Sequence, residues 1–154
     1  MSYINDYLEQ LISISSGQQQ EYFKWIHRNI KIYTKKDVLD ETGEYQRHIS
    51  QANLKACFAN SRNATFKTPG LKYLEGFYCL EGMKFLCLEH AFNITPDNKV
   101  LDTTSMNFGF DVCEWGGIEI PKEFLKSKEY KARYEFCPAP SIYYQWLKKE
   151  NRLN

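Results

Sequence analysis

The sequence predicts an α+β domain in which helices surround a small antiparallel sheet. Amphipathic helical patterns occupy both ends of the chain, and segments rich in Tyr, Phe and Leu, typical of strands, lie between residues 71 and 104. The tight turn "PDNK" at residues 96–99 joins two of these segments. Strands and helices that are grouped, rather than alternating, favour an antiparallel sheet over a doubly wound fold.

The N-terminal part of the chain is expected to be mainly helical. Residues 3–15 carry apolar side chains at helical spacing, and Ser2 or Asn5 can cap this helix. A second short helix is expected over residues 18–29. Residues 30–48 alternate briefly and then become polar, which indicates an extended segment followed by a loop.

The middle of the chain is expected to change from helix to strand. Ser50 is a suitable N-cap for a helix over residues 50–64, and Pro69-Gly70 marks the turn that follows. Three strands are then expected, the last two forming a hairpin, over residues 71–80, 83–94 and 100–104.

The C-terminal part is expected to be a loop followed by helices. Residues 107–121 contain three glycines and indicate a loop with short extended pieces, whereas residues 121–134 have a helical pattern with Pro121 in the first turn. A closing helix is expected after Pro140. Because neither a linker nor an internal repeat is visible, residues 1–154 are expected to form a single domain.

Composition excludes several classes of function. With 43% hydrophobic residues, 25% charged residues and a net charge of +1, the chain resembles an ordinary globular protein and lacks the basic excess of a nucleic-acid binder. The sequence shows neither a membrane span nor a signal peptide, so a cytoplasmic protein with reduced thiols and no membrane partner is expected. Five cysteines without a C-x-x-C pair fit neither a full disulfide framework nor a common zinc module. No metal or other cofactor is expected.

Two residues of the expected hairpin can form a hydrogen-bonded pair. Strand alternation places His90 on the same face as Leu88 and Phe92, where a lone histidine is most often a core residue. Pairing about the turn places Asp102 near residues 90–92, so its carboxylate can accept the imidazole N–H. Asp102 can also cap the turn that follows it, and the two roles are compatible.

Cys57 is the candidate nucleophile. A cysteine near a helix start has its thiolate stabilised by the helix dipole and by free backbone N–H groups. A neighbouring histidine that exchanges the thiol proton activates it further. Cysteine, histidine and aspartate together would support nucleophilic attack on a carbonyl group. The other cysteines, Cys79, Cys87, Cys113 and Cys137, lack such neighbours and are interpreted as core or strand residues.

The segments "ACFANS" and "HAFNITPDNKVLDTT" resemble the transglutaminase-like branch of the papain-like cysteine peptidase superfamily. The resemblance covers residues 56–104, about a third of the chain. It implies a papain-like core, in which the helix carrying the cysteine packs on a small antiparallel sheet. It also implies Cys57 as nucleophile, His90 as general base and Asp102 as the carboxylate that orients the histidine.

The chain departs from this family at the residue after the cysteine. Phe58 stands where the family usually has Trp, so an indole N–H cannot donate to the oxyanion there. The backbone N–H of Cys57 is one candidate donor. Gln51, six residues earlier, resembles the glutamine of papain-type enzymes, although an exposed amide is the default for glutamine. Asn53 and Asn60 are the alternatives.

Two further segments have both a structural and a functional interpretation. Glu75 is interpreted as a solvent-facing strand residue, and Gly76 as a point where a backbone or a ligand approaches closely. Trp115, followed by Gly116-Gly117, is either a substrate platform on a mobile loop or a buried ring in a surface turn.

The leading hypothesis is a thiol-dependent acyl-transfer enzyme that hydrolyses an amide bond as a peptidase, amidase or deamidase. Its substrate would be a peptide, a protein or a small amide or ester, and no nucleic-acid partner is expected. The alternatives are an amine acyltransferase of the transglutaminase type and a non-catalytic binding or inhibitor protein on the same fold. In a purely structural protein, Cys57 and His90 would be core residues lying far apart.

Overall fold

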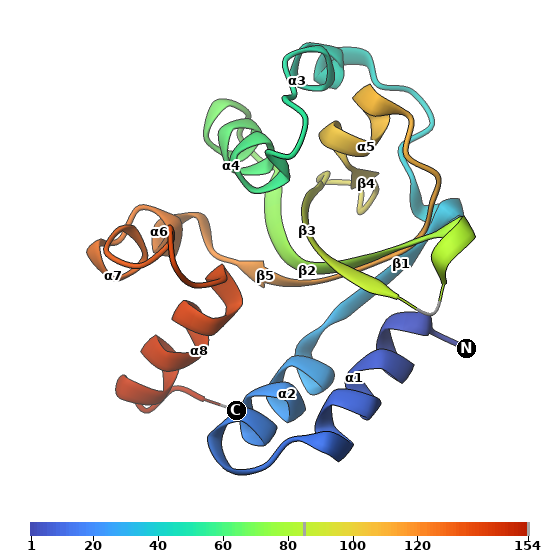
Figure 1. Ribbon diagram of the computed structural model, residues 1–154. Coiled ribbons are helices and arrows are strands. Elements are labelled where there is room, and N and C mark those ends of the chain that lie inside the picture. The colour runs from blue at the N-terminus through green and yellow to red at the C-terminus, as the bar shows by residue number, and fades with distance from the viewer. Residues whose placement is uncertain (85, 154) are drawn as a thin grey trace.

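A five-stranded antiparallel sheet organises the fold, which confirms the α+β class (Figure 1). The computed structural model describes residues 1–84 and 86–153. The strands are β1 (Lys31–Thr34), β2 (Lys72–Leu80), β3 (Cys87–Ile94), β4 (Val100–Leu101) and β5 (Val112–Ile120). Their order in the sheet is β1-β5-β2-β3-β4, and the sheet is strongly curled.

Helices cover both faces of the sheet (Figure 1). One face carries α1 (Tyr3–Ile14), α2 (Gly17–Asn29) and α8 (Ala139–Lys149). α4 (Cys57–Lys67) packs on the β2–β3 end of the sheet, where Asn93 of β3 donates to the Ser61 carbonyl oxygen at 3.2 Å, and it lies on the same side of β3 as these helices. α3 (Gln46–Ser50) and α5 (Thr103–Phe108) lie on the other side of the curled sheet. The short helices α6 (Lys122–Leu125) and α7 (Lys128–Lys131) connect β5 to α8, and single 3₁₀ turns are η1 (Lys35–Asp37), η2 (Gly43–Tyr45) and η3 (Glu81–Met83).

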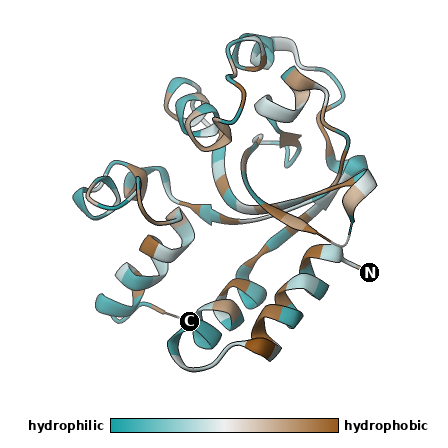
Figure 2. Cartoon of the chain, viewed as in Figure 1, coloured by the Kyte–Doolittle hydropathy of each residue, from teal (hydrophilic) through white to brown (hydrophobic). Residues whose placement is uncertain are grey.

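The apolar faces of these layers form the core. Ile4, Leu8 and Trp25 from α1 and α2 pack with Ile142 of α8 on one face of the sheet. On the opposite face, a second cluster contains Leu74, Phe92, Ile94, Val100 and Trp115. Figure 2 shows hydrophobic residues running along the strands, whereas α7 is mainly hydrophilic. Among residues 1–84 and 86–153, every helix is too short or too polar to span a bilayer.

The N-terminal helices follow the sequence predictions, and the β3–β4 hairpin follows them in part. Its second strand, expected over residues 100–104, ends at Leu101, because Asp102 caps a helix that begins at Thr103. Ser2 caps α1, since its hydroxyl accepts the backbone N–H of Asn5 at 3.1 Å. In the hairpin, Asn93 pairs with Leu101 and Ile94 with Val100. β3 begins at Cys87, later than the expected start at residue 83. Phe85, which falls in that expected strand, lies outside the described residues.

The prediction of a loop over residues 107–121 is wrong. β5 lies inside the sheet, between β1 and β2. Its paired glycines do not form a turn; they make room for side chains of the neighbouring strands β1 and β2. A Cβ on Gly116 would lie 2.9 Å from Cδ1 of Ile32, and one on Gly117 would lie 2.9 Å from Cβ of Leu74.

The predicted helix over residues 50–64 begins later than expected. Ser50 is the last residue of α3 rather than an N-cap, and the chain then turns until Lys55, whose φ of 61° places it in the left-handed region. Ala56 is the N-cap of α4, and Cys57 is its first residue. The sulfur of Cys57 is therefore carried by the first turn of the helix.

Candidate active site

The hairpin places His90 and Asp102 side by side in the core. Nε2 of His90 lies 2.7 Å from Oδ2 of Asp102, and the exposed fractions of the two side chains are 3% and 1%. Asp102 directly follows β4, so the register that pairs Asn93 with Leu101 brings its carboxylate toward His90. This placement agrees with the position expected from the sequence.

Asp102 accepts hydrogen bonds from three different parts of the chain. It is the N-cap of α5, because Oδ1 accepts the backbone N–H of Ser105 at 3.1 Å. Its Oδ2 accepts the indole N–H of Trp115 at 2.8 Å, in addition to the bond with His90. Burial raises the pKa of Asp102, but the charge and hydrogen bond of His90 and the donors on Ser105 and Trp115 outweigh it. The net pKa is lowered, so Asp102 remains ionised.

His90 is held as a buried cation. Burial lowers its pKa, but the charge and hydrogen bond of Asp102, followed by those of Cys57, raise it from the ordinary 6.5 to about 9. Tyr78 stacks on the imidazole, with ring centroids 4.0 Å apart and planes inclined by 9°. Because Nε2 is bonded to Asp102, Nδ1 is the nitrogen left to exchange a proton with a neighbour.

Cys57 is the third candidate catalytic residue, after His90 and Asp102. Its thiol is partly exposed, and it lies close enough to His90 to raise the histidine pKa through both hydrogen bonding and charge. Since Cys57 is the first residue of α4, its backbone N–H is among those that have no partner inside the helix. That N–H can act as an oxyanion donor.

Asn60 fixes the loop that leads into Cys57. Its amide donates to the carbonyl oxygen of Asn53 at 2.9 Å and to the hydroxyl of Thr104 at 2.7 Å, and it accepts the Asn53 N–H at 3.1 Å. Asn107 adds a bond of 3.0 Å to the carbonyl oxygen of Ala52. The start of α4 is thus tied to α5, the helix that Asp102 caps.

The side chains of Gln51 and Asn53 lie away from this site. Both residues are exposed, and both line a small hollow with His48 and Lys67. Neither Cys57 nor the other two candidate catalytic residues line that hollow. Asn53 contributes through its backbone, and Asn60, one of the alternatives, acts as a positioning residue for the loop.

Trp115 is a buried strand residue and not a substrate platform on a mobile loop, which was one of its two interpretations from the sequence. It lies in β5 and is 4% exposed, so it is neither on a loop nor available to a substrate. Its indole N–H instead fixes the carboxylate of Asp102. The signal that could have revealed this role is the strand pattern of residues 112–120, which the neighbouring glycines obscured.

Replacing Trp115 with Phe is expected to lower the free energy of unfolding by about 1–3 kcal/mol, because Asp102 loses a buried donor. The rate at which iodoacetamide labels Cys57 should also fall, since the orientation of His90 depends on that carboxylate. Urea unfolding and mass spectrometry of the labelled protein measure the two effects. Trp146→Phe is the matched control and should leave the labelling rate unchanged. Equal effects of the two substitutions would show that Trp115 is only a packing residue.

The remaining cysteines have structural surroundings. Cys79 and Cys87 are buried and face each other across β2 and β3, with their sulfurs 3.0 Å apart. The thiol of Cys113 donates to the carbonyl oxygen of Cys79 at 3.3 Å. Within the part of the chain that the structure describes, no three His, Cys, Asp or Glu side chains gather closely enough to hold a metal ion.

Glu75 is buried, so the prediction of a solvent-facing residue is wrong. It is 4% exposed, and its carboxylate accepts the Tyr73 hydroxyl at 2.7 Å and the Ala139 N–H at 2.7 Å. Burial raises the pKa of Glu75 from 4.5 to about 7. The neighbouring Gly76 allows two strands to approach closely, because a Cβ there would overlap the carbonyl oxygen of Gly116.

Comparisons of the chain with protein-family models, with curated proteins and with solved structures find no match. The assignment of function therefore depends on the geometry around Cys57, His90 and Asp102. That geometry joins a helix-start thiol to a buried imidazolium and a carboxylate that accepts three donors.

Proposed function

We propose that the protein is a thiol-dependent acyl-transfer enzyme in which Cys57 is the nucleophile. The Cys57 thiol passes its proton to His90, and the sulfur attacks the carbonyl carbon of an amide. His90 then gives that proton to the departing amine as the C–N bond breaks. A water molecule then attacks the thioester, passes a proton to His90 and releases the acid together with the thiol. Asp102 keeps the imidazole oriented throughout.

The buried His90–Asp102 pair beside a helix-start cysteine is the observation that carries this proposal. Removing two charges from water is costly, and apolar residues of the same size would serve the stability of a core at least as well. The pair is therefore better explained by chemistry than by packing. In a structural protein, His90 would have no reason to lie where the Cys57 thiol perturbs its pKa.

The arrangement also supports the finer assignment of a transglutaminase-like, papain-like core. α4 starts at the cysteine and packs against β2 and β3, while the histidine and the aspartate come from β3 and the end of β4. These are the relative positions that the resemblance of residues 56–104 implies. We take hydrolysis as the reaction, because water is always present; transfer to an amine is the second candidate.

Iodoacetamide at pH 6 tests the proposal. Cys57 should be alkylated roughly tenfold or more faster than Cys113 and Cys137, because an activated thiolate reacts where an ordinary thiol does not. The two other cysteines are also partly exposed, so they are internal controls for access. Mass spectrometry of proteolytic peptides gives each rate.

Substitution of the histidine completes this test. His90→Ala should reduce labelling of Cys57 to the rate of the control cysteines. His90→Gln keeps a donor toward Asp102, so it serves where the alanine variant fails to fold, and it should have the same effect. Equal slow labelling of all accessible cysteines in the wild-type protein would rule out the enzyme. A non-catalytic binding protein would then be the better description.

A further inference from the structure

A hollow of about 310 Å³ opens beside the start of α4. It lies between α1, α2, β2 and the beginning of α8, and its volume falls at the lower end of the range for small-ligand sites. Aromatic side chains dominate its walls: Tyr7, Tyr22, Phe23, Phe58 and Phe77. Cys57, His90 and Asp102 do not line it, but Phe58 directly follows Cys57 in the first turn of α4.

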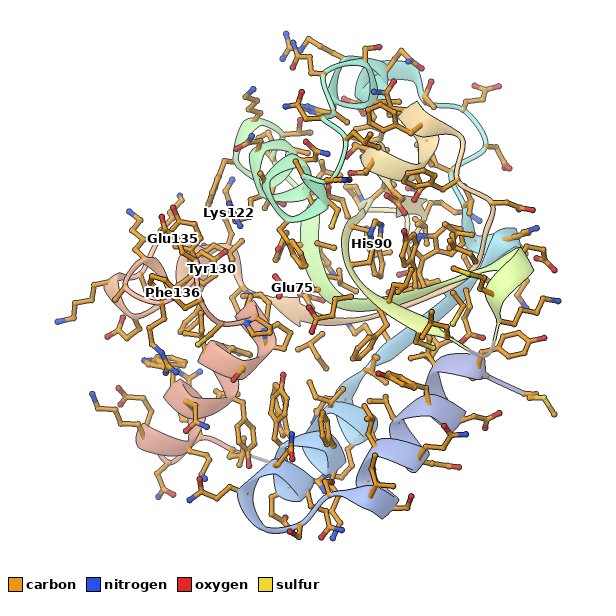
Figure 3. The ribbon with its side chains drawn as sticks, viewed as in Figure 1. Glu75, His90, Lys122, Tyr130, Glu135 and Phe136 are labelled. Carbon is orange, nitrogen blue, oxygen red and sulfur yellow. The ribbon has the colours of Figure 1, made fainter. Side chains whose placement is uncertain are left out.

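A second hollow of about 270 Å³ continues from the first toward α7. The two share the walls made by Phe58, Glu75, Glu89 and Pro138. At its far side lies Phe136, a large apolar side chain that is 83% exposed. Figure 3 shows Glu75 between the sheet and the segment that carries Tyr130, Glu135 and Phe136.

The charged side chains that line the first hollow are acidic. Glu75 and Glu89 line it, and none of its lining residues is Lys or Arg. Glu89 is exposed at its edge, opposite Phe77 in the β2–β3 pairing. Arg62 lines the second hollow, where it donates to the hydroxyl of Tyr130 at 3.1 Å. Aromatic walls with an exposed carboxylate at the edge complement an apolar group that ends in a cation.

We propose that the hollow beside Phe58 binds an apolar substrate group that bears an ammonium or guanidinium ion. The ring faces of the walls and the exposed carboxylate of Glu89 would hold the cation, and Glu75 would add negative charge from the wall behind them, while the apolar part fills the space between α1, α2 and β2. This inference rests on the proposed function of Cys57, because it assigns the hollow to the part of the substrate next to the reacting carbonyl.

The affinity for a cation should increase as the pH rises through about 7, because Glu75 becomes ionised there. The groups that face this carboxylate are Tyr73 on β2, Arg62 on α4, Tyr22 on α2, Tyr130 on α7, Glu89 on β3 and the Ala139 N–H on α8. The three tyrosines have raised pKa values through burial, so between pH 6 and pH 8 they stay neutral.

Benzylamine is a suitable probe, because it joins one aromatic ring to one ammonium group. Titration at pH 8, followed by NMR, should show binding about threefold or more tighter than that of benzyl alcohol, its neutral analogue. Glu89→Gln should remove most of this preference, and Phe58→Ala should weaken both ligands. Glu44→Gln, which removes an exposed carboxylate elsewhere, should change neither affinity. Equal binding of the two ligands, or no binding, would overturn the assignment.

Alkylating probes separate this inference from the proposed function. N-[4-(aminomethyl)benzyl]iodoacetamide should label Cys57 faster than N-(4-methylbenzyl)iodoacetamide, and Glu89→Gln should reduce the difference. Plain iodoacetamide provides the reference rate for the thiol itself. Selective labelling by plain iodoacetamide without any preference for the cationic probe would refute the cation site and leave the enzyme standing. Loss of selectivity with plain iodoacetamide would refute the enzyme.

Discussion

Asp102→Ala is expected to lower the free energy of unfolding by about 3–5 kcal/mol, the typical cost of removing one partner of a buried ion pair. The substitution leaves the His90 imidazolium buried without its counter-ion. It also leaves the Trp115 indole N–H and the Ser105 N–H without their acceptor. Urea unfolding at pH 7, followed by circular dichroism, measures the loss.

Asp102→Asn separates orientation from charge. An asparagine at this position has a single oxygen for three donors, and its amide N–H groups favour His90 with the proton moved to Nδ1. That tautomer cannot take the thiol proton, so alkylation of Cys57 at pH 6 should fall to the rate of Cys113. Asp97→Asn, in the β3–β4 turn, is the control carboxylate and should leave the rate unchanged. A loss below about 1 kcal/mol for Asp102→Ala would contradict the buried ion pair.

Glu75→Gln is expected to make the protein more stable above neutral pH. Burial raises the folded-state pKa of Glu75 from 4.5 to about 7, so the folded chain holds this proton more tightly than the unfolded chain. Stability is therefore lost as the pH rises from about 4.5 through 7, by about 3 kcal/mol in total. Glutamine stays neutral and reproduces the protonated pattern: its amide can donate to the Tyr73 oxygen and accept the Ala139 N–H.

Denaturant unfolding of Glu75→Gln and the wild type between pH 5 and pH 8 measures this effect. The difference in unfolding free energy should grow by about 2.5 kcal/mol over that range, in favour of the variant. The titration of His90 is common to both proteins and cancels in the difference. Glu44→Gln provides the baseline for an exposed carboxylate. A difference that does not change with pH would mean that Glu75 is already ionised at pH 5.

The parts of the site that depend on local pairing could be predicted from the sequence. His90 and Asp102 lie on a hairpin with a short turn, and strand alternation with that turn was enough to place them together. The start of α4 could not be predicted in the same way. It is set by hydrogen bonds to the preceding loop from Asn60, inside α4, and from Asn107, on α5.

The burial of Glu75 and the position of Trp115 in a strand were not predicted, because distant partners decide both environments. Glu75 is bonded to Ala139, 64 residues later in the chain, and a lone glutamate in a strand pattern ordinarily faces water. Trp115 depends on β5, whose glycines favour a turn in any local interpretation but pack against Ile32 and Leu74 in the fold. Only the tertiary arrangement distinguishes a glycine that bends the chain from one that makes room for a neighbour.

In the enzyme proposed above, catalysis and the stability of the fold would depend on different residues. The base and its carboxylate belong to the core, where a strand end, a helix start and a tryptophan all converge on one side chain. Cys57 is partly exposed in the first turn of α4. The hydrogen bonds that fix the start of this helix come from Asn60 and Asn107 and not from the Cys57 thiol. A single change at residue 57 would therefore silence the chemistry and keep the architecture. Such a change would turn a catalyst of this kind into a receptor for its own substrate.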